Sequence, residues 1–472
     1  MELVLIQEID ELSAHHHNIK TFVSDIGPKY SSHVVDALTE WFVSFRSADE
    51  SPFAAKRGIN FLGRRSSLRS LFFLLVYHED EMVAFAPFFR FQVDFGDAGT
   101  SYEVIAFCPD STIFFYSDVL IKVGYEERAL ETLFGFLGQY NDKMPHIILF
   151  NHIPSSSGTL PLLLRHALEL TPHGFNVSIS PVFWRGGLYP WNLHKLQTVL
   201  QNARDNAGMS DESRRNIQSV MDKISASSKT MLVFRKNHLP LKSAVYNIFG
   251  ESKPSDTLFE LYNAVEAIFQ SYPVKYPYLI LPRSPEAFEN SLSASKRYYY
   301  QRYRKHFLAS NGRFVKLHAD EIADQDINDF LTLHRERWGN KSNILNNSTS
   351  SFLFAFLRKL AQNGLLKLFF AEHQSKRLAC VCCIDFMGRR EFLSSGRSLN
   401  DDKLRAGKLL LYDAIIDAIR DGLNLFDFGY GDEAYKSDFN WSYLTNNVIA
   451  LFYNLLPKQF SNVFPLYEEL IL

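Results

Sequence analysis

The sequence predicts a mixed α/β fold in which one unit of three strands, a helix and a further strand occurs twice. In the first half these elements fall at residues 71–89 (a hairpin), 101–108, 126–141 and 146–154. In the second half they fall at residues 365–386 (a hairpin), 391–396, 406–422 and 423–431. A hairpin followed by a crossover helix adds a parallel strand to an antiparallel sheet, so we expect two mixed sheets with the same strand order.

The composition indicates a large globular protein. The chain has 472 residues, of which 46% are hydrophobic and 22% charged. This length exceeds that of a usual domain with one hydrophobic core, so we expect two domains. The 41 Phe and 22 Tyr residues argue against disorder. A formal net charge of −2 gives no overall electrostatic reason to expect a polyanionic partner, although a local basic patch is compatible with it.

The N-terminus and the cysteines indicate a cytoplasmic protein. The opening MELVLIQEIDEL has no basic residue before its apolar run, unlike a secretion signal, and no apolar stretch reaches membrane-spanning length. Cys380, Cys382 and Cys383 crowd one strand, where they cannot surround a zinc ion tetrahedrally. We therefore expect buried thiols in a reducing compartment, no metal site and no membrane span.

A basic loop precedes the helix of the second half. It contains the cationic and small residues Arg397, Lys403, Arg405, Ala406, Gly407 and Lys408. Free backbone N–H groups and the positive end of the helix dipole suit a pyrophosphate, although such loops are also found simply solvated. The corresponding helix of the first half starts with Glu126 and Glu127, so only the second half is expected to bind phosphate.

The strand ending at Phe428 runs into a group of titratable residues. Asp432, Glu433, Tyr435 and Lys436 follow Gly-Tyr-Gly at this strand end, where open α/β sheets commonly bind ligands. Carboxylates there can act as a general base, and a phenol or ammonium as a proton donor. The alternative is a helix start capped by Asp432, and both interpretations are compatible.

Two further segments carry polar side chains at helical spacing. Residues 294–307, ASKRYYYQRYRKHF, interleave basic residues with tyrosines, which predicts either a nucleic-acid-binding face or a helix that packs its tyrosines inward. In FLTLHRERWGNK, the side chains of His334, Trp338 and Lys341 share roughly one helical face and are candidates for substrate binding. The alternative for His334 and Trp338 is a place in the core and its rim.

These segments together resemble the GNAT acyltransferase superfamily, and more narrowly its CelD-like and FemAB-like members, which carry two GNAT domains in one chain. The resemblance lies in KRYYYQRYRKHFLASNGRFVKL, LHRERW, the hairpin at 366–386, RAGKLLLYDAIIDAIRDGLNLFDFGYGDEAYK, and the matched hairpin and helix of the first half. It implies an N-terminal GNAT-like domain at 1–192 that has degenerated, a helical arm at 193–271, and a C-terminal GNAT acyltransferase domain at 272–472.

The resemblance also implies a donor and roles for residues. Acyl-CoA would be held through its pyrophosphate by the loop 403–408, and its pantetheine arm would lie along the strand 391–396. Backbone N–H groups near Ser394 and Ser395 would polarise the thioester, and Asp432 or Glu433 would take a proton from the acceptor. Tyr430 or Tyr435 would protonate the leaving thiolate.

The expected reaction is acyl transfer to an amine or hydroxyl on a sugar or cell-envelope precursor. The superfamily's glycine signature is incomplete here, because Gly407 is followed by Lys408 and Leu409. Two alternatives therefore stay open. One is aminoacyl transfer from tRNA, with the tyrosine-rich basic helix facing the tRNA, and the other is a non-catalytic scaffold. The sequence does not indicate the oligomeric state.

Overall fold

The structure is a computed structural model. It describes residues 1–27, 29–49, 66–94, 101–107, 116–140, 147–181, 275–339, 350–399, 404–429, 431 and 435–453, with single residues between 201 and 222. The chain divides into two compact units, one of Met1–Val182 with Lys275–Leu472 and the other of Phe183–Val274. Most of the expected helical arm at 193–271 lies outside the described residues.

The first half alternates strands and helices in the predicted order. Its strands are β1 (Glu2–Ile6), β2 (Ser66–His78), β3 (Glu81–Asp94), β4 (Ser101–Ala106), β5 (Leu120–Ile121), β6 (Ile147–Pro154) and β7 (Phe175–Pro181). Its helices are α1 (Ile9–Ile26), α2 (Val35–Asp49), α3 (Glu126–Gln139) and α4 (Leu160–Glu169), with short 3-10 turns η1 (Ser31–His33) and η3 (Thr171–His173). Helix α3 is the predicted crossover between β4 and β6.

The second half contains the same unit of a hairpin, a third strand, a helix and a further strand, with other elements before and after it. Its strands are β8 (Lys275–Ile280), β9 (Gly312–His318), β10 (Leu366–His373), β11 (Lys376–Phe386), β12 (Arg389–Arg397), β13 (Leu425–Asp427) and β14 (Ser442–Tyr453). Its helices are α9 (Pro285–Ser291), α10 (Ala294–Ala309), α11 (Asp324–Trp338), α12 (Ser350–Gln362) and α13 (Ala406–Arg420), with 3-10 turns η4 (Ala319–Glu321) and η7 (Lys436–Asp438).

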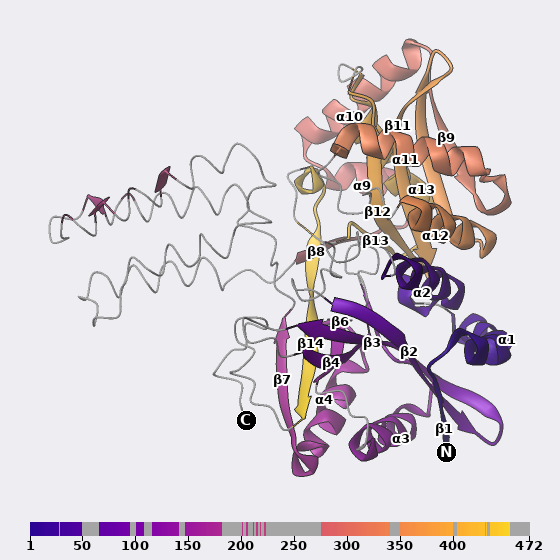
Figure 1. Ribbon diagram of the computed structural model, residues 1–472. Coiled ribbons are helices and arrows are strands. Elements are labelled where there is room, and N and C mark those ends of the chain that lie inside the picture. Colours follow the sequence, from indigo (N-terminus) through magenta and orange to yellow (C-terminus); the bar gives the residue numbers. More distant parts are fainter. Residues whose placement is uncertain are drawn as a thin grey trace. The chain divides into compact units, whose positions relative to one another are not determined.

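The strand orders of the two halves match. In the first half the order β1-β2-β3-β4-β6 has antiparallel neighbours up to β4 and then a parallel pair, β4 with β6. In the second half β9-β10-β11-β12-β13 repeats this pattern and ends in the parallel pair of β12 with β13. The predicted duplication of a mixed α/β unit is therefore confirmed (Figure 1).

The two sheets are not separate, contrary to our expectation. Strand β14 pairs with β8 through its first residues, Ser442–Thr445, and with β6 and β7 through the rest of its length. It thereby joins the two sheets into one continuous sheet (Figure 1). Strand β8 comes before the second-half unit in sequence, yet it lies between β13 and β14. The repeated sequence pattern ends before β14 and does not reveal this sharing.

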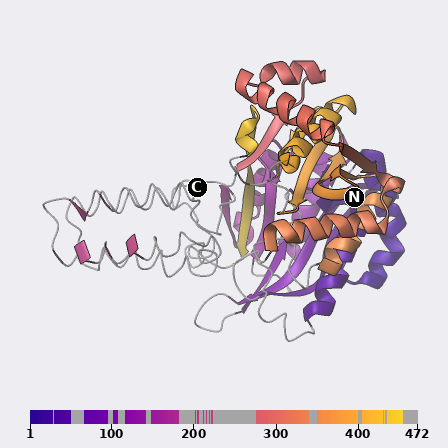
Figure 2. The same ribbon diagram turned by 90° about the horizontal axis from the view of Figure 1, so that it is seen from above.

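Helices cover the sheet of the second half on both faces (Figure 2). Helix α13 packs on β10, β11 and β12 through a buried face that includes Leu411, Ile415 and Ala418, whose three- and four-residue spacing is that of one helical face. Helix α11 packs on β11 and β12, also contacting α12. No helix among the described residues combines the length and apolar character needed to cross a membrane.

Candidate active site

The N-terminus of α13 is open. Arg405, which directly precedes the helix, has φ 55° and ψ 23°, the left-handed conformation that is unusual for a residue other than glycine. Its side chain makes no capping hydrogen bond. The Arg405 carbonyl oxygen accepts from the N–H groups of Lys408 and Leu409, so Ala406 and Gly407 carry the first-turn N–H groups that lie at the positive end of the helix dipole.

A pocket of about 220 Å³ lies at this helix end. It is lined by Tyr300, Arg337, Leu378, Val381, Phe392, Ser395, Arg397, Ser398, Arg405, Ala406, Gly407, Lys408, Leu411, Tyr435 and Phe439. Four of these residues are cationic and none is acidic, while six are aliphatic or Phe side chains. The pocket thus joins a cationic part to an apolar part. Its volume is below the roughly 300 Å³ of typical small-molecule sites, which suits a slender chain.

Glycine at position 407 leaves room beside the helix end. A Cβ atom built there would meet only the Arg397 Cδ, at 3.7 Å, which is an ordinary van der Waals distance. A side chain at this position is therefore compatible with the fold, but it would occupy space at the pocket wall.

Asp438 holds one side of the pocket together. The carboxylate is buried, accepts a hydrogen bond from Tyr300 Oη at 3.2 Å and pairs with Lys408 Nζ at 3.1 Å. It also pairs with Lys296 from α10. Burial alone would raise the pKa of Asp438, but the hydrogen bonds from Lys296 and Lys408 outweigh burial and bring the pKa below its ordinary value. This carboxylate fixes Lys408 at the pocket wall.

Strands β12 and β13 part beside the pocket. Their parallel pairing covers only Arg389–Glu391 with Leu425–Asp427, although β12 continues to Arg397. On its other edge, the pairing of β12 with β11 shifts register between Phe392 and Ser394, which leaves Leu393 in a bulge. The segment that the resemblance assigns to pantetheine, 391–396, is therefore unpaired with β13 from Phe392 onward.

Helix α11 fixes the same segment from the other face of the sheet. The Ser395 carbonyl oxygen accepts a hydrogen bond from Trp338 Nε1 at 3.0 Å and lies 3.2 Å from His334 Nδ1. Arg337 donates to Ser395 Oγ at 2.5 Å, and Ser394 Oγ lies 3.0 Å from His334 Nδ1. These contacts hold the strand in place where it leaves β13.

Close packing explains the glycine that follows. A Cβ at Gly396 would lie 2.3 Å from the His334 backbone nitrogen, so the helix and the strand approach too closely for any side chain. His334 is buried, and burial lowers its pKa to about 4. His334 and Trp338 contact β12 and do not line the pocket, which matches the core-and-rim alternative.

The strand end at Phe428 is only partly described. Tyr435 lines the pocket, whereas Lys436 is buried and donates to the Gly431 carbonyl oxygen at 2.8 Å. This hydrogen bond connects η7 to Gly431. The predicted site residues Tyr430, Asp432 and Glu433, together with Lys403 and Lys341, lie outside the described residues.

The structure thus brings together Ser395, Arg405, Ala406, Gly407, Lys408 and Tyr435 of the predicted set. Sequence reasoning missed Arg337, Tyr300 and Asp438. Arg337 precedes Trp338 within LHRERW, and its charge beside a Trp was an available signal. Asp438 had no such signal, because its partners Lys296 and Lys408 are 142 and 30 residues away in the chain.

One family model matches part of the second half. Residues 294–437 match the acetyltransferase (GNAT) domain family. No curated protein matches the chain at significant similarity.

Among solved structures, the chain is similar to FemX at 11% identity, with a TM-score of 0.48 over 98% of this chain and 100% of that one. It is similar to L-PGS from Bacillus licheniformis at 8% identity, with a TM-score of 0.42 over 94% of each chain. A tandem GNAT protein from the clavulanic acid biosynthesis pathway shows 8% identity and a TM-score of 0.31, over 95% of this chain and 98% of that one.

Residues 294–437 of the second half therefore carry a GNAT-type domain, as the resemblance in the sequence predicted. The first half repeats the strand order of this half, so the same mixed α/β unit occurs twice in the chain.

Proposed function

We propose that the protein transfers an acyl group from acyl-CoA to an amine or hydroxyl, on a sugar or cell-envelope precursor. The observation that carries the donor assignment is the pocket at the N-terminus of α13, where four cationic side chains and an uncapped helix end adjoin an apolar interior. A pyrophosphate suits the first part and a pantetheine arm the second.

Arg405 and Lys408 would neutralise the phosphates, and the N–H groups of Ala406 and Gly407 would donate to them. The backbone at Arg405 is left-handed where the chain enters the helix. The Arg405 side chain has no acceptor oxygen and makes no capping hydrogen bond. Lys403 is proposed to add a further positive charge to this loop.

The pantetheine arm would follow β12 where it has parted from β13. Backbone N–H groups near Ser394 and Ser395 would polarise the thioester, since preorganised donors stabilise the oxyanion that forms. His334, Trp338 and Arg337 would act as positioning residues, because their contacts fix Ser395. Lys436 would position the loop that carries the acid and base groups.

The proton transfers are assigned to the strand end. Asp432 or Glu433 would take the proton of the acceptor, and Tyr435 or Tyr430 would protonate the thiolate. Tyr435 lines the pocket, which supports its assignment as the acid.

Calorimetric titration with CoA tests the donor. Arg405→Glu reverses a charge at the helix end, and we expect it to weaken CoA binding by about 1 to 3 kcal/mol, the range of a lost charged hydrogen bond. Arg128→Glu is the matched control, because Arg128 is an exposed residue in the first turn of α3. Equal affinity in all three proteins, or no CoA binding by the parent, would refute the assignment.

Aminoacyl transfer from tRNA is the second candidate, favoured by one surface. On α10, Tyr298 is 62% exposed, Arg302 lies over its ring at 6.0 Å, and Lys305 is exposed. The same helix supplies Tyr300 to the pocket. Salt-dependent tRNA binding in a gel shift, lost in an Arg302→Ala and Lys305→Ala variant, would favour this donor over CoA. If neither CoA nor tRNA binds, the scaffold alternative remains.

A further inference from the structure

A buried carboxylate stands directly behind the cationic wall of the pocket. Asp438 belongs to η7 and is only 8% exposed. It pairs with Lys408 Nζ at 3.1 Å and also with Lys296 from α10, and Tyr300 Oη donates to it at 3.2 Å. Lys408 and Tyr300 line the pocket, whereas Asp438 and Lys296 do not. A residue outside the pocket lining therefore controls the charge that Lys408 presents to a ligand.

Two ammonium groups share this one carboxylate. Burial raises the pKa of Asp438, but the hydrogen bonds from Lys296 and Lys408 lower it by more, so the pKa lies below its ordinary value and the group is charged. The side chain of Lys408 is 45% exposed and that of Lys296 is 40% exposed, so neither ammonium is enclosed. A flexible lysine stem allows the Lys408 ammonium to turn from Asp438 toward a ligand.

The two cations at the start of α13 differ in this respect. Arg405 and Lys408 both line the pocket. Within the part of the chain that the structure describes, Arg405 forms no ion pair, whereas Lys408 is paired with Asp438. An anion in the pocket meets the Arg405 guanidinium without a competitor, but it must replace a carboxylate at Lys408. The loss of that ion pair reduces what the anion gains from Lys408.

We propose that Asp438 is an internal competitor of the bound anion, which holds Lys408 while the pocket is free and takes it back when the anion leaves. Asp438 thereby limits the affinity of the pocket for phosphate groups and speeds their release. This inference rests on the proposed binding of the CoA pyrophosphate at the N-terminus of α13. It deepens that assignment, because it names a residue outside the pocket lining that sets how tightly the donor and the product CoA are held.

The second lysine makes this exchange possible. When Lys408 turns to a phosphate, Lys296 and the Tyr300 hydroxyl stay on Asp438. The buried carboxylate therefore keeps one counterion and one hydrogen-bond donor, and it avoids the large cost of an unpaired buried charge. The exchange moves one lysine side chain and leaves the contact between η7 and α10 in place.

A purely structural role for Asp438 is the competing explanation. The carboxylate joins η7 to α10 and α13, so its removal would loosen the pocket wall. The two explanations predict opposite signs for the change in anion affinity. A loosened wall binds the anion more weakly, whereas the removal of a competitor makes binding tighter.

Calorimetric titration with CoA and with inorganic pyrophosphate, at fixed ionic strength, measures this sign. Asp438→Asn keeps the size of the side chain and an acceptor oxygen for Tyr300, but it removes the negative charge. We expect both ligands to bind roughly 10-fold more tightly, the scale of one nearby charge in a partly screened site. CoA should also dissociate more slowly in stopped-flow measurements, because affinity differences between related complexes arise mostly in the dissociation rate.

Asp413→Asn is the matched control. Asp413 lies on α13 and pairs with Arg304 from α10 at 3.4 Å, so it joins the same two helices as Asp438. Neither Asp413 nor Arg304 lines the pocket. This variant loses an ion pair between α10 and α13 without freeing a pocket cation, and we expect its affinity for both ligands to equal that of the parent.

A second pair of variants leaves Asp438 in place. Because Lys408 is already engaged, Lys408→Met should weaken pyrophosphate binding by about threefold or less, and Arg405→Met should weaken it by about 10-fold or more. In the Lys408→Met background, Asp438→Asn should no longer tighten binding. This double-mutant cycle isolates the coupling between the two residues.

The outcomes separate this inference from the proposed function. If Asp438→Asn is folded by circular dichroism and binds both ligands as the parent does, or more weakly, Asp438 is structural and the inference is wrong. Equal losses in Lys408→Met and Arg405→Met, or tightening that persists without Lys408, would also overturn it. If the parent binds pyrophosphate but not CoA, the donor assignment fails, while the sign measured with pyrophosphate still decides the role of Asp438. If the parent binds neither ligand, both proposals fail.

Discussion

Helices α3 and α13 occupy the same place in the two halves, yet their N-termini differ. At α3 the backbone N–H of Gly124, which precedes the helix, donates to Glu126 Oε2 at 2.8 Å, so a carboxylate of the first turn stands beside the helix end. At α13 the preceding residue, Arg405, provides no such oxygen, and Gly407 and Lys408 line a pocket. Carboxylates repel phosphate, so one fold gives an anion-binding geometry only where the first-turn residues permit it.

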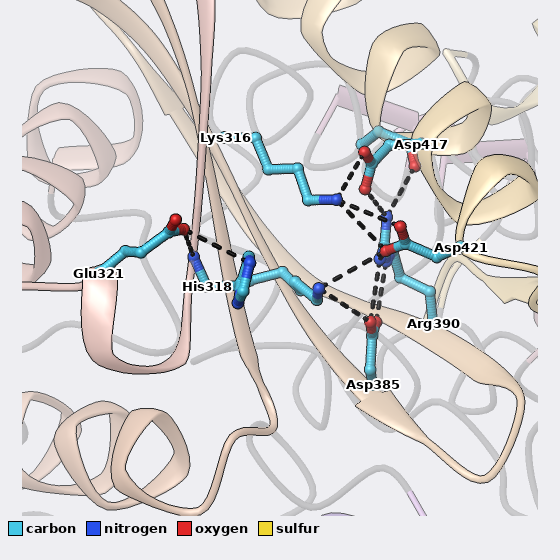
Figure 3. Close-up of polar contacts among 9 residues, drawn as sticks. Lys316, His318, Glu321, Asp385, Arg390, Asp417 and Asp421 are labelled. Atoms are coloured by element: carbon cyan, nitrogen blue, oxygen red, sulfur yellow. Dashed lines mark hydrogen bonds and ion pairs between the residues drawn. The ribbon is translucent and has the colours of Figure 1, made fainter.

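The two helices also differ in how they are anchored. Helix α3 packs through apolar residues that include Leu130, Leu133 and Phe134. Helix α13 adds a buried ionic network centred on Arg390, which pairs with Asp385, Asp417 and Asp421 at 2.8, 2.6 and 2.8 Å (Figure 3). Lys316 from β9 also pairs with Asp417 and Asp421. The network fixes the helix on β12 while its other end stays open.

The largest expected effect follows from breaking this anchor. Arg390 is fully buried, so Arg390→Met should leave carboxylates without their counterion and lower the free energy of unfolding by about 3 to 5 kcal/mol. In α3, Arg128→Met changes an exposed residue and should stay within about 0.5 kcal/mol of the parent. Urea unfolding followed by circular dichroism measures both. A loss below about 1 kcal/mol in Arg390→Met would mean that the network is not an anchor.

Both halves contain buried histidines with lowered pKa values. Burial lowers the pKa of His33 and His152 in the first half, and of His334 in the second, to about 4. Between pH 6.5 and 4 the unfolded chain therefore binds protons that the folded chain does not, so stability falls as the pH falls. Each histidine contributes a slope of about 1.4 kcal/mol per pH unit and about 3 kcal/mol in total at pH 4.

Glu391 acts in the opposite direction. Its pKa is raised to about 8, so its contribution is present below the ordinary glutamate pKa and is lost as the pH rises through 8. Unfolding at several pH values should show that His152→Gln and His334→Gln each reduce the acid slope by one proton. Because β14 joins both sheets, we expect the same reduction from either half. An effect from one half only would show that the halves unfold separately.

The smallest expected effect on stability comes from a substitution at the N-terminus of α13. Gly407→Ala should raise the free energy of unfolding by about 0.5 to 1 kcal/mol, because alanine favours a helix and its Cβ meets no close atom. The same methyl group occupies space at the pocket wall, so CoA affinity should fall. Gly135→Ala in α3, where a Cβ also has open space, is the control for stability alone. Unchanged CoA affinity in Gly407→Ala would mean that the ligand does not approach this backbone.

The local sequence determined most of the secondary structure of the repeated unit and the position of the basic loop. Alternating and helical patterns of apolar residues indicated the repeated unit and the buried face of α13, because periodicity follows directly from strand and helix geometry. The basic loop before α13 was recognisable for the same reason, since residues at a helix end act through their own backbone. The sequence therefore predicts five residues that line the pocket, namely Ser395, Arg405, Gly407, Lys408 and Tyr435.

Only the tertiary structure decided which distant residues meet. Asp438 joins Lys408 and Lys296, Tyr116 joins Asp427 across 311 positions, and β14 completes both sheets. His334 and Trp338, which the sequence left as either substrate-binding or core residues, contact the Ser395 carbonyl oxygen on β12. Long-range pairing depends on how the whole chain closes, and a single sequence carries no periodic signal for it.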